Sequence, residues 1–402
     1  MPTQKRIPEL RFPEFEGEWM EKRLGSITSK IGSGKTPTGG ELIYEKKGIP
    51  FIRSQNVNDN QLILDETHIP AEVHKEMGGS KVFANDILLN ITGASIGRSC
   101  VVPADFGEGN VNQHVAIIRL KNGSSKFLQS ILSSWFGQKL IYQGQTGSGR
   151  EGLNFESIKQ FKIHFPSLPE QQKIAAFLTA VDKKIGLLQQ KKTLLETWKK
   201  GLMQQIFSQQ LRFKDDEGRD FPDWEKAEFL ELVSKSKVKH NPMVEPSNYP
   251  CIELESISQN TGILLQIFSS TDQKSIKNKF LKGDILLGKL RPYLRKFLIA
   301  PFDGVCSSEI WVLRGAKLHN LFLYYLIQTN KFQAVANVSS GSKMPRSDWN
   351  HVSGTPFFYP SLAEQQKIAD FLSSVDKMIA NLGRQVEGAQ GFKKGLLQRM
   401  FV

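Results

Sequence analysis

The sequence contains few of the patterns that mark secreted, membrane-bound or metal-binding proteins. Its 402 residues include three cysteines, Cys100, Cys251 and Cys306, which lie far apart. This spacing predicts neither a disulfide framework nor a Cys-x-x-Cys metal site, so we expect reduced, structural thiols. No apolar run approaches the roughly 18 residues of a transmembrane helix, and the first residues, MPTQKRIPELRF, lack the apolar core of a signal peptide. We therefore expect a cytoplasmic protein without a membrane partner.

Motifs for self-contained catalysis are also missing. The stretch GSGKT at 32–36 resembles part of a phosphate-binding loop, but the pattern GxxxxGK[ST] requires glycine where Ser29 stands, and Pro37 would interrupt the following helix. The stretch NPM at 241–243 lacks the aromatic residue with which amino-methyltransferases stack a flipped base. No HExxH pattern is present. These gaps argue against a chain that is by itself a methyltransferase or a nuclease.

Positive charge is what the sequence has in excess. It contains 53 lysines and arginines against 40 aspartates and glutamates, a formal net charge of +13. Such an excess favours a polyanionic partner, nucleic acid first and an anionic membrane surface second. The length is sufficient for two domains of ordinary size together with long helices.

One long segment occurs twice. PSLPEQQKIAAFLTAVDKKI begins at Pro166 and PSLAEQQKIADFLSSVDKMI begins at Pro360, while KKGLMQQIF ends at Phe207 and KKGLLQRMF ends at Phe401. The offset is 194 residues at both ends (360 − 166 and 401 − 207). No net insertion therefore separates the copies, and the internal repeat is the main feature of the chain's organisation.

Apolar residues recur in both copies with heptad spacing, which is typical of a long helix with one buried seam. The seam of the first copy consists of Ile174, Leu178, Val181, Ile185, Leu188, Leu195 and Leu202. The seam of the second copy consists of Ile368, Leu372, Val375, Ile379, Leu382, Val386 and Leu396. A helix of roughly 38 residues would be about 57 Å long and needs a partner for its seam. We predict that the two copies form an intramolecular two-helix coiled coil; the alternative is one ordinary core helix per domain.

The two stretches in front of these helices share a scaffold but not their loop residues. Each opens with an aromatic, acidic lead-in, LRFPEFEGEW at 10–19 and LRFKDDEGRDFPDW at 211–224, which we interpret as a segment that packs phenylalanine and tryptophan against a helix. Short strand patterns and glycine turns predict a mixed α/β domain in both. The run after Asp86, Ile-Leu-Leu, recurs after Asp284. A duplicated scaffold with diverged loops suits a protein that reads two different targets.

This order of globular stretch, long motif, globular stretch and long motif resembles the DNA-specificity subunit of type I restriction–modification systems. The resemblance extends over essentially the full length. It implies an α+β fold with two target recognition domains, residues 1–165 and 209–359. It also implies that two spacer helices, residues 166–208 and 360–402, separate these domains and form an antiparallel coiled coil.

The resemblance implies that each domain reads one half of an asymmetric, bipartite site in double-stranded DNA. In that family the helices set the gap between the half-sites and dock two modification subunits, which methylate adenine N6. Restriction subunits driven by ATP complete the complex. No cofactor is then expected in this chain, while S-adenosylmethionine, ATP and magnesium are expected in the partner subunits, and the chain itself is expected to be non-catalytic.

Loop residues with paired hydrogen-bonding groups are the candidates for DNA contacts. In the first domain they are Lys35, Arg53, Gln55, Asn56, Asn112, Gln113, Ser148 and Arg150. In the second domain they are Lys289, Arg291, Tyr293, Arg295, Ser308 with its neighbour Glu309, Lys343 and Arg346. We interpret His114 as a sheet residue rather than a reader. The simpler alternative for each candidate is a solvated loop residue.

Two hypotheses of different class remain. The first is a non-catalytic scaffold that reads DNA. The alternative is a coiled-coil interaction scaffold whose positive charge serves RNA or an acidic protein. The alternative gives no reason for two diverged domains on one duplicated scaffold, so the first is preferred.

Overall fold

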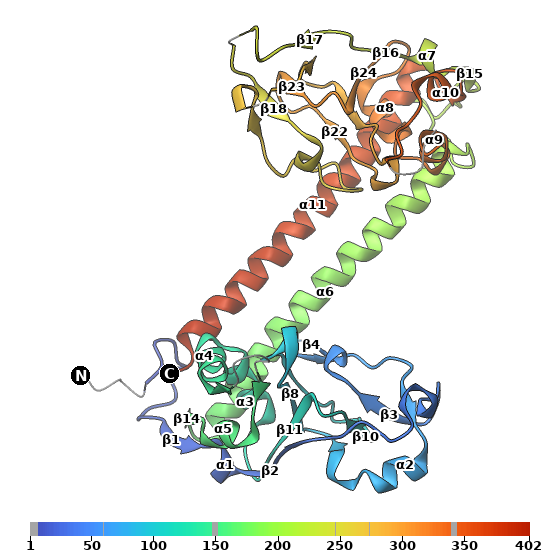
Figure 1. The fold of residues 1–402 in the computed structure, drawn as a ribbon. Coiled ribbons are helices and arrows are strands. Elements are labelled where there is room, and N and C mark those ends of the chain that lie inside the picture. Colours follow the sequence, from blue (N-terminus) through green and yellow to red (C-terminus); the bar gives the residue numbers. More distant parts are fainter. Residues whose placement is uncertain (1–6, 59, 147–151, 246, 273, 339–343) are drawn as a thin grey trace. The chain divides into compact units, whose positions relative to one another are not determined.

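The computed structural model describes residues 7–58, 60–146, 152–245, 247–272, 274–338 and 344–402 (Figure 1). The chain forms two compact units. Unit 1 comprises Met1–Gln189 and Arg384–Val402, and unit 2 comprises Gln190–Gly383. The two longest helices, α6 (Leu168–Phe207) and α11 (Leu362–Arg399), contribute to both units. The units are thus divided within these helices, whereas the sequence-based division places the domain ends at the helix starts. None of the helices in the described ranges is long and apolar enough to span a membrane.

Unit 1 contains two four-stranded sheets. The first is antiparallel and has the order β2 (Thr28–Ser33), β11 (Val115–Leu120), β8 (Ile87–Asn90) and β9 (Ser99–Val101). The second has the order β6 (His68–Ile69), β3 (Ile49–Ile52), β10 (Glu108–Val111) and β7 (Lys81–Phe83), with β3 and β10 parallel. Three strand pairs complete the unit: β1 (Met20–Arg23) with β14 (Lys162–Phe165), β4 (Val57–Asn58) with β5 (Gln61–Leu62), and β12 (Gln145–Thr146) with β13 (Gly152–Leu153).

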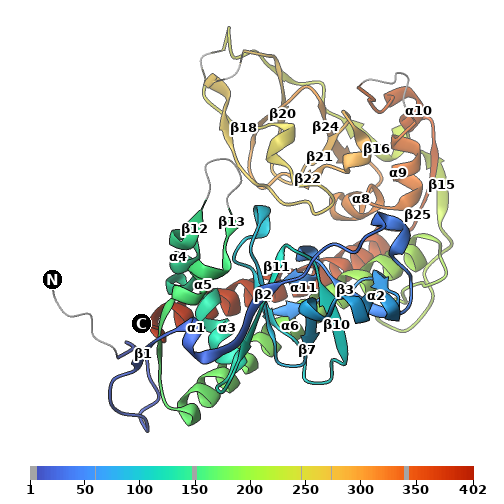
Figure 2. The same cartoon turned by 60° about the horizontal axis from the view of Figure 1, so that its bottom comes forward.

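The short helices of unit 1 are α1 (Leu24–Ile27), α2 (Ala71–Glu76), α3 (Ser125–Ser133), α4 (Trp135–Gly144) and α5 (Phe155–Gln160). Figures 1 and 2 both show α3, α4 and α5 grouped on one side of the unit, with α2 and β3 on its other side. The helices begin where side chains cap them, since Ser124, Ser134 and Asn154 accept hydrogen bonds from the first turns of α3, α4 and α5.

Unit 2 repeats this plan with two sheets of its own. The antiparallel sheet has the order β16 (Val233–Lys235), β24 (Ile310–Gly315), β21 (Ile285–Gly288) and β22 (Phe297–Ile299). The other sheet has the order β17 (Lys239–His240), β20 (Lys277–Phe280), β23 (Gly304–Cys306), β18 (Pro250–Ile252) and β19 (Phe268–Ser269), with β18 and β23 parallel. The remaining elements are the pair β15 (Glu225–Glu228) and β25 (Pro356–Tyr359) and the helices α7 (Phe229–Leu232), α8 (Asn320–Leu326), α9 (Asn330–Ala336) and α10 (Trp349–Ser353).

An equivalent ion pair marks the repeat inside the two antiparallel sheets. The buried carboxylate of Asp86, at the start of β8, accepts two hydrogen bonds of 2.7 Å from Arg119 on β11. Asp284, at the start of β21, accepts bonds of 2.7 and 2.8 Å from Arg314 on β24. Such forked pairs fix geometry as well as charge. The predicted α+β fold, with two mixed domains and two long helices, is confirmed.

Both long helices complete the hydrophobic core of each unit. In unit 1, Ile174 and Leu178 of α6 join Leu396 of α11, and Met400 and Phe401 just after it, in one buried cluster. In unit 2 the corresponding cluster contains residues of both helices, namely Met203, Ile206, Ile368, Ala369 and Leu372. Full burial of one such side chain contributes about 1.5–3 kcal/mol. The helices are therefore parts of the domains as well as connections.

The predicted seam residues face the interior of the structure. Those that are buried are Ile174, Leu178, Ile185, Ile368, Leu372, Val375, Leu382, Val386 and Leu396. Those that are partly buried are Val181, Leu188, Leu195, Leu202 and Ile379. In unit 2, Lys192 lies against Gly383 and Lys199 pairs with Asp376, so rising numbers on α6 meet falling numbers on α11. The two helices are thus antiparallel.

The lead-ins pack against the long helices, as predicted. Phe12 meets Phe177 of α6 edge to face, with ring centroids 5.7 Å apart, and Arg11 donates two hydrogen bonds of 2.8 Å to the buried Glu170. In unit 2, Arg212 donates two bonds of 2.9 Å to the buried Glu364 of α11. Each glutamate lies in the first turn of its helix, where a negative charge is favoured.

The three cysteines are free and buried. Burial raises the pKa of Cys100 to about 12, and burial together with the charge of Glu253 raises the pKa of Cys251 to about 12. Thiols with such pKa values are poor nucleophiles, which agrees with a structural role.

Candidate nucleic-acid interface

In unit 1, the segment that carries Lys35 lies against the turn that carries Gln113. The turn 112–114 connects β10 to β11, and its Gln113 side chain accepts a hydrogen bond of 2.6 Å from Thr36. Gly34 makes this approach possible, because a Cβ added at Gly34 would lie 1.6 Å from a carbonyl oxygen of the chain beside the turn. Lys35 and Gln113 are both exposed. Two predicted candidates thus share one surface.

The other residues of this turn hold its shape. Asn112 is buried, and its Oδ1 accepts a hydrogen bond of 3.1 Å from the backbone of His114. The His114 ring in turn lies 2.7 Å from the hydroxyl of Thr92. Asn112 therefore supports the turn in this conformation, while Gln113 presents its side chain to solvent.

Arg53, Gln55 and Asn56 converge on a carboxylate that sequence reasoning missed. Asp65 Oδ2 accepts hydrogen bonds of 2.8 Å from Arg53, 2.9 Å from Gln55 and 3.1 Å from Asn56. Arg53 also donates to the hydroxyl of Thr67 at 2.7 Å. Asn56 is buried, so a contact with a base would require its present hydrogen bonds to break. Gln55 is exposed and Arg53 is partly exposed.

This cluster changes the acidity of Asp65. Partial burial is the largest single influence and by itself would raise the pKa of the carboxyl. The hydrogen bonds from Thr67, Gln55 and Asn56 together outweigh it, so the pKa of Asp65 lies well below its usual range. Asp65 is thus a stable anion that orients the side chains of two candidates, Arg53 and Gln55.

In unit 2, three segments meet at the end of β21. Lys289 donates its backbone N–H to Glu309 at 2.9 Å, and Ser347 donates its backbone N–H to Lys289 at 2.8 Å. The Arg346 side chain binds Glu309 at 3.0 Å. Ser308 lies in the turn between β23 and β24 and is exposed. The structure therefore brings the candidates Lys289, Ser308 and Arg346 together, with Glu309 as their shared acidic neighbour.

The same junction exists in both units. Thr92, just after β8, forms a bridge with Gly152, and Leu290, just after β21, forms a bridge with Arg346. In the sequence, the glycine-rich stretches QTGSGREG at 145–152 and SGSK at 340–343 come at or shortly before the bridge residues Gly152 and Arg346. The candidates Ser148, Arg150 and Lys343 lie outside the described residues, so their DNA contacts stay predictions.

The segment 289–295 of unit 2 carries the remaining candidates. It contains a single 3₁₀ turn, Pro292–Leu294, in which Tyr293 is 57% exposed. Arg291 is exposed in front of this turn, and Arg295 behind it donates a hydrogen bond of 3.2 Å to Asn330. The segment therefore carries an exposed aromatic residue between two arginines in the sequence.

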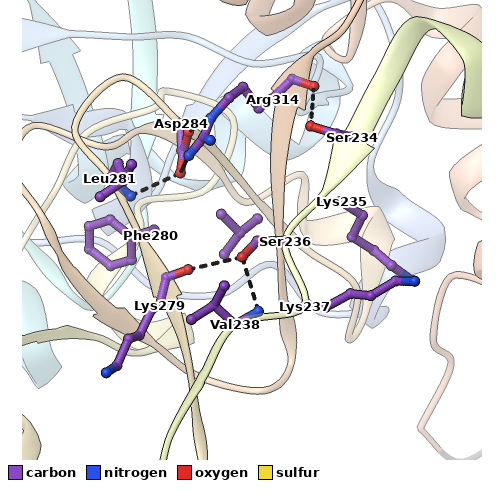
Figure 3. A pocket seen from close by; sticks show the side chains of 11 residues that line it. Ser234, Lys235, Ser236, Lys237, Val238, Lys279, Phe280, Leu281, Asp284 and Arg314 are labelled. Carbon is purple, nitrogen blue, oxygen red and sulfur yellow. Dashed lines mark hydrogen bonds and ion pairs between the residues drawn. The ribbon is translucent and has the colours of Figure 1, made fainter.

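A pocket of about 360 Å³ beside β16 in unit 2 adds positive charge (Figure 3). Figure 3 shows the Asp284–Arg314 pair on one side of it and Lys235 and Lys237 on the other. Among the described residues, neither lysine has a carboxylate within ion-pair distance. Lys235 Nζ lies 4.0 Å from the ring centroid of Trp349, and burial, followed by repulsion from neighbouring lysines, lowers its pKa.

Within the described ranges, no group of three or more His, Cys, Asp or Glu side chains is placed to hold a metal ion. The polar groups brought together at the strand ends are amides, hydroxyls, lysines and arginines. These groups suit hydrogen bonding to base edges and phosphates.

Comparisons with known proteins agree with this chemistry. The family model for the type I restriction modification DNA specificity domain matches residues 16–197 and 223–387. The type I restriction enzyme MjaVIII specificity subunit of Methanocaldococcus jannaschii is 24% identical over 415 residues, covering 98% of this chain and 93% of the relative. The EcoDI specificity subunit of Escherichia coli is 32% identical over 125 residues, covering 31% of this chain and 28% of the relative.

Solved structures show the same fold. The crystal structure of a type I restriction–modification S subunit from M. genitalium superposes with a TM-score of 0.59 at 14% identity, covering 98% of this chain and 99% of that chain. A structure described as the basis of complex assembly and conformational transition of the type I restriction–modification system gives a TM-score of 0.56 at 15% identity, covering 94% and 96%. Because the family model matches two long stretches, one for each duplicated scaffold, the chain belongs to the type I restriction–modification specificity subunits and carries two DNA target recognition domains.

Proposed function

We propose that each unit reads one half of an asymmetric, bipartite site in double-stranded DNA. The observation that carries this proposal is the repeated strand-end junction, which has the same backbone but different side chains in the two units. Unit 1 presents Gln113, which binds Thr36 next to Lys35, whereas unit 2 presents Ser308 next to Glu309, which binds Arg346. One scaffold with two different surfaces suits two different half-sites on one DNA duplex.

The charge of the chain supports binding to the DNA backbone. The net charge of +13 attracts phosphates irrespective of sequence. That attraction weakens as the salt concentration rises, because the release of condensed counterions from the DNA then becomes less favourable. In unit 2, Lys235 and Lys237 line a pocket and have no carboxylate partner among the described residues. Such lysines suit phosphate contacts that position the domain, while the strand-end side chains distinguish bases.

The long helices offer two similar sites for partner subunits. Trp198 of α6 is 50% exposed in unit 2, and Phe392 of α11 is 58% exposed in unit 1. They occupy the same place in the repeat, because their offset is 194 residues (392 − 198). Two equivalent exposed aromatic positions fit two copies of one modification subunit, and aromatic residues commonly anchor interfaces.

In this assignment the chain supplies recognition and the partners supply chemistry. The modification subunits bind S-adenosylmethionine, and restriction subunits use ATP and magnesium. The assembled complex acts on DNA in the cytoplasm, with the helices setting the gap between the half-sites. The chain itself is non-catalytic in this proposal.

The test is to express the chain with its modification subunit in a host free of DNA methylation and to map N6-methyladenine across the genome. We expect a two-part motif with a fixed unspecified gap, and no such motif when the modification subunit is expressed alone. A soluble complex that methylates no two-part motif would contradict the proposal. Binding of the purified chain to RNA in preference to duplex DNA would favour the interaction-scaffold alternative.

Docking has its own test. We expect that W198A and F392A each weaken co-purification of the modification subunit and that the double variant abolishes it. Y142A is the matched control, because Tyr142 is 73% exposed but lies on α4 and not on a long helix. Co-purification that survives the double variant would place the docking surface elsewhere.

A further inference from the structure

The two units share a turn of equal length at the same place in the sheet, and the residues of the two turns differ. In unit 1 the segment 91–97, here called the β8–β9 turn, follows Asn90, whose N–H bonds to Arg98 at 2.9 Å. In unit 2 the segment 289–295, here called the β21–β22 turn, follows Gly288, whose N–H bonds to Lys296 at 2.9 Å. Each turn contains a single 3₁₀ turn of three residues. The two turns therefore have the same length and the same closing hydrogen bond, although the 3₁₀ turn lies at Gly93–Ser95 in unit 1 and one position later, at Pro292–Leu294, in unit 2.

Both turns place two residues in the left-handed region of backbone space. In the β8–β9 turn these are Gly93 (φ 73°) and Gly97 (φ 87°). In the β21–β22 turn the same positions hold Arg291 (φ 50°) and Arg295 (φ 47°). Glycine adopts this region freely, whereas a residue with a Cβ is strained there. Unit 2 thus keeps an arginine at both positions where its own scaffold favours glycine.

Hydrogen bonds hold the strained backbone in place. The N–H of Arg291 bonds to Pro345 at 2.7 Å, the N–H of Arg295 bonds to Pro292 at 2.8 Å, and the carbonyl of Arg295 accepts from Asn260 at 3.1 Å. Strained residues persist where the surroundings determine their conformation, and they concentrate at functional sites. The two guanidinium groups consequently extend from a fixed backbone.

These two arginines also differ from the others of unit 2 in their partners. The unit has six arginines. Four bind carboxylates: Arg212 binds Glu364, Arg219 binds Asp215, Arg314 binds Asp284 and Arg346 binds Glu309. Within the described part of the chain, Arg291 has no side-chain hydrogen bond or ion pair, and Arg295 bonds to the amide of Asn330 without a carboxylate. Among the described residues of unit 2, the strained arginines are therefore the two without a carboxylate partner.

We propose that Arg291 and Arg295 are specificity-determining residues that bind guanine bases in the half-site read by unit 2. This inference rests on the proposed function and names the chemistry of one half-site. An arginine fork donates two hydrogen bonds to O6 and N7 of guanine in the major groove. The fixed backbone lowers the cost of ordering these side chains on binding, and the exposed Tyr293 between them adds a surface for contact.

The glycines of unit 1 give the proposal a specific asymmetry. The β8–β9 turn has no side chain at either left-handed position, so it cannot read guanine there. Unit 1 presents Gln113 and Lys35 nearby instead. Guanine recognition by the β21–β22 turn is thus expected to affect one part of the DNA motif and leave the other unchanged.

The experiment maps methylation by the full complex containing the wild-type chain, R291K, R291Q, R291G or the corresponding variants of Arg295. The control is R219Q, since Arg219 is an exposed arginine of the same unit with acidic partners. We expect guanine in one part of the wild-type motif and a fall in methylation of that site by roughly 10-fold or more in each variant, because the paired hydrogen bonds to guanine O6 and N7 are lost. R219Q should leave the motif unchanged.

R291K separates base reading from simple attraction. Lysine keeps the charge but lacks the planar fork, so it retains a phosphate contact and loses guanine discrimination. Undiminished guanine preference in R291K and R295K would overturn the proposal, as would a motif without guanine in either part. A wild-type complex that yields no two-part motif would instead contradict the proposed function, which keeps the two failures distinct.

Thermal unfolding supplies a second readout. Replacing Arg291 by glycine relieves the backbone strain, so we expect R291G to raise the midpoint of unit 2 by about 2 °C, while R291Q, which keeps a Cβ, leaves it unchanged. If Arg291 instead had a structural role, both R291G and R291Q would lower the thermal unfolding midpoint of unit 2. Loss of recognition together with gained stability is the combined result that the proposal expects.

Discussion

Lys393 Nζ lies 2.5 Å from Asp182 Oδ1 in unit 1, and Lys199 Nζ lies 2.6 Å from Asp376 Oδ1 in unit 2. The repeat converts one pair into the other, since both the aspartates and the lysines are offset by 194 residues (376 − 182 and 393 − 199). In unit 1 the acid is on α6 and the base on α11, and in unit 2 the roles are exchanged. This exchange is what antiparallel packing of two like helices requires.

The two pairs are predicted to differ in strength. Asp376 also accepts a hydrogen bond of 2.8 Å from the hydroxyl of Tyr325, whereas the matching position in unit 1 is Ile131. We expect D182A to lower the free energy of unfolding by about 1 kcal/mol and D376A by about 2 kcal/mol. Urea denaturation measures both, and Y325F combined with D376A forms a double-mutant cycle. Equal losses in the two single variants would contradict this account.

Removal of either lead-in arginine is predicted to be costly. Glu170 and Glu364 are buried, so R11A and R212A each leave a buried carboxylate without its charge partner, at a cost of about 3–5 kcal/mol. Glu170 keeps a hydrogen bond of 3.2 Å from the indole of Trp19, whereas the indole nitrogen of Trp224 has no hydrogen-bond partner among the residues that the structure describes. R212A should therefore lose more stability than R11A.

Chemical denaturation checks the order of these losses, and hydrogen exchange shows which unit opens. R219Q again serves as the exposed control. Losses of less than 1 kcal/mol for R11A and R212A would show that water readily reaches both glutamates.

A single methyl group is predicted to disturb the candidate interface of unit 1. A Cβ at Gly34 would lie 1.6 Å from the Val111 carbonyl, whereas at Gly32 it meets nothing within 4 Å. G34A should destabilise unit 1 by about 1–3 kcal/mol and weaken binding to its half-site, because it shifts the backbone that carries Lys35 and Thr36 away from the turn of Gln113. G32A, two residues away, is the matched control and should behave as the wild type in melting and DNA-binding assays. Similar behaviour of both variants would remove the argument for this close approach.

Asp65 is predicted to make unit 1 acid-sensitive. Its folded pKa lies below the ordinary value of 3.8, so the unfolded chain takes up the proton first. The carboxylate thus contributes stability above about pH 4, and this contribution is lost as the pH falls through the lower folded value. Urea unfolding between pH 6 and pH 3 should show a steeper loss for the wild type than for D65N. E66Q, which removes the neighbouring carboxyl, should keep the wild-type slope; a wild-type slope in D65N would exclude Asp65 as the source.

Repetition explains why much of the fold was predictable. The heptads and the shared offset predicted the long helices and their seam, because a regular apolar spacing leaves few alternatives. The lead-ins were predictable for the same reason, since Phe12 and Phe213 recur in matching motifs. The turn conformations and the side-chain partners depend on tertiary contacts, which the sequence patterns do not reveal.

The turns illustrate that limit. ITGASIG at 91–97 and KLRPYLR at 289–295 look unrelated, and the structure shows that both have two left-handed positions four residues apart. The anchoring of Arg53 by Asp65 was equally hidden, because the two residues are twelve positions apart and no motif connects them. Arg53 was therefore placed among free loop side chains, whereas the structure gives it a fixed partner.

Unit 1 consists of two separate stretches of the chain, and this affects the order in which the two units fold during synthesis. Unit 2 is one continuous stretch, Gln190–Gly383, whereas unit 1 needs Arg384–Val402 to complete its core with Leu396, Met400 and Phe401. The backbone of Leu10 also bonds to Arg399 at 2.8 Å. At about 5–20 residues per second, the amino-terminal domain must wait roughly 10–40 s after its first part is made. Of the two units, unit 1 is thus begun before unit 2 and completed after it, and loss of Arg384–Val402 would damage the unit that contains Met1–Gln189.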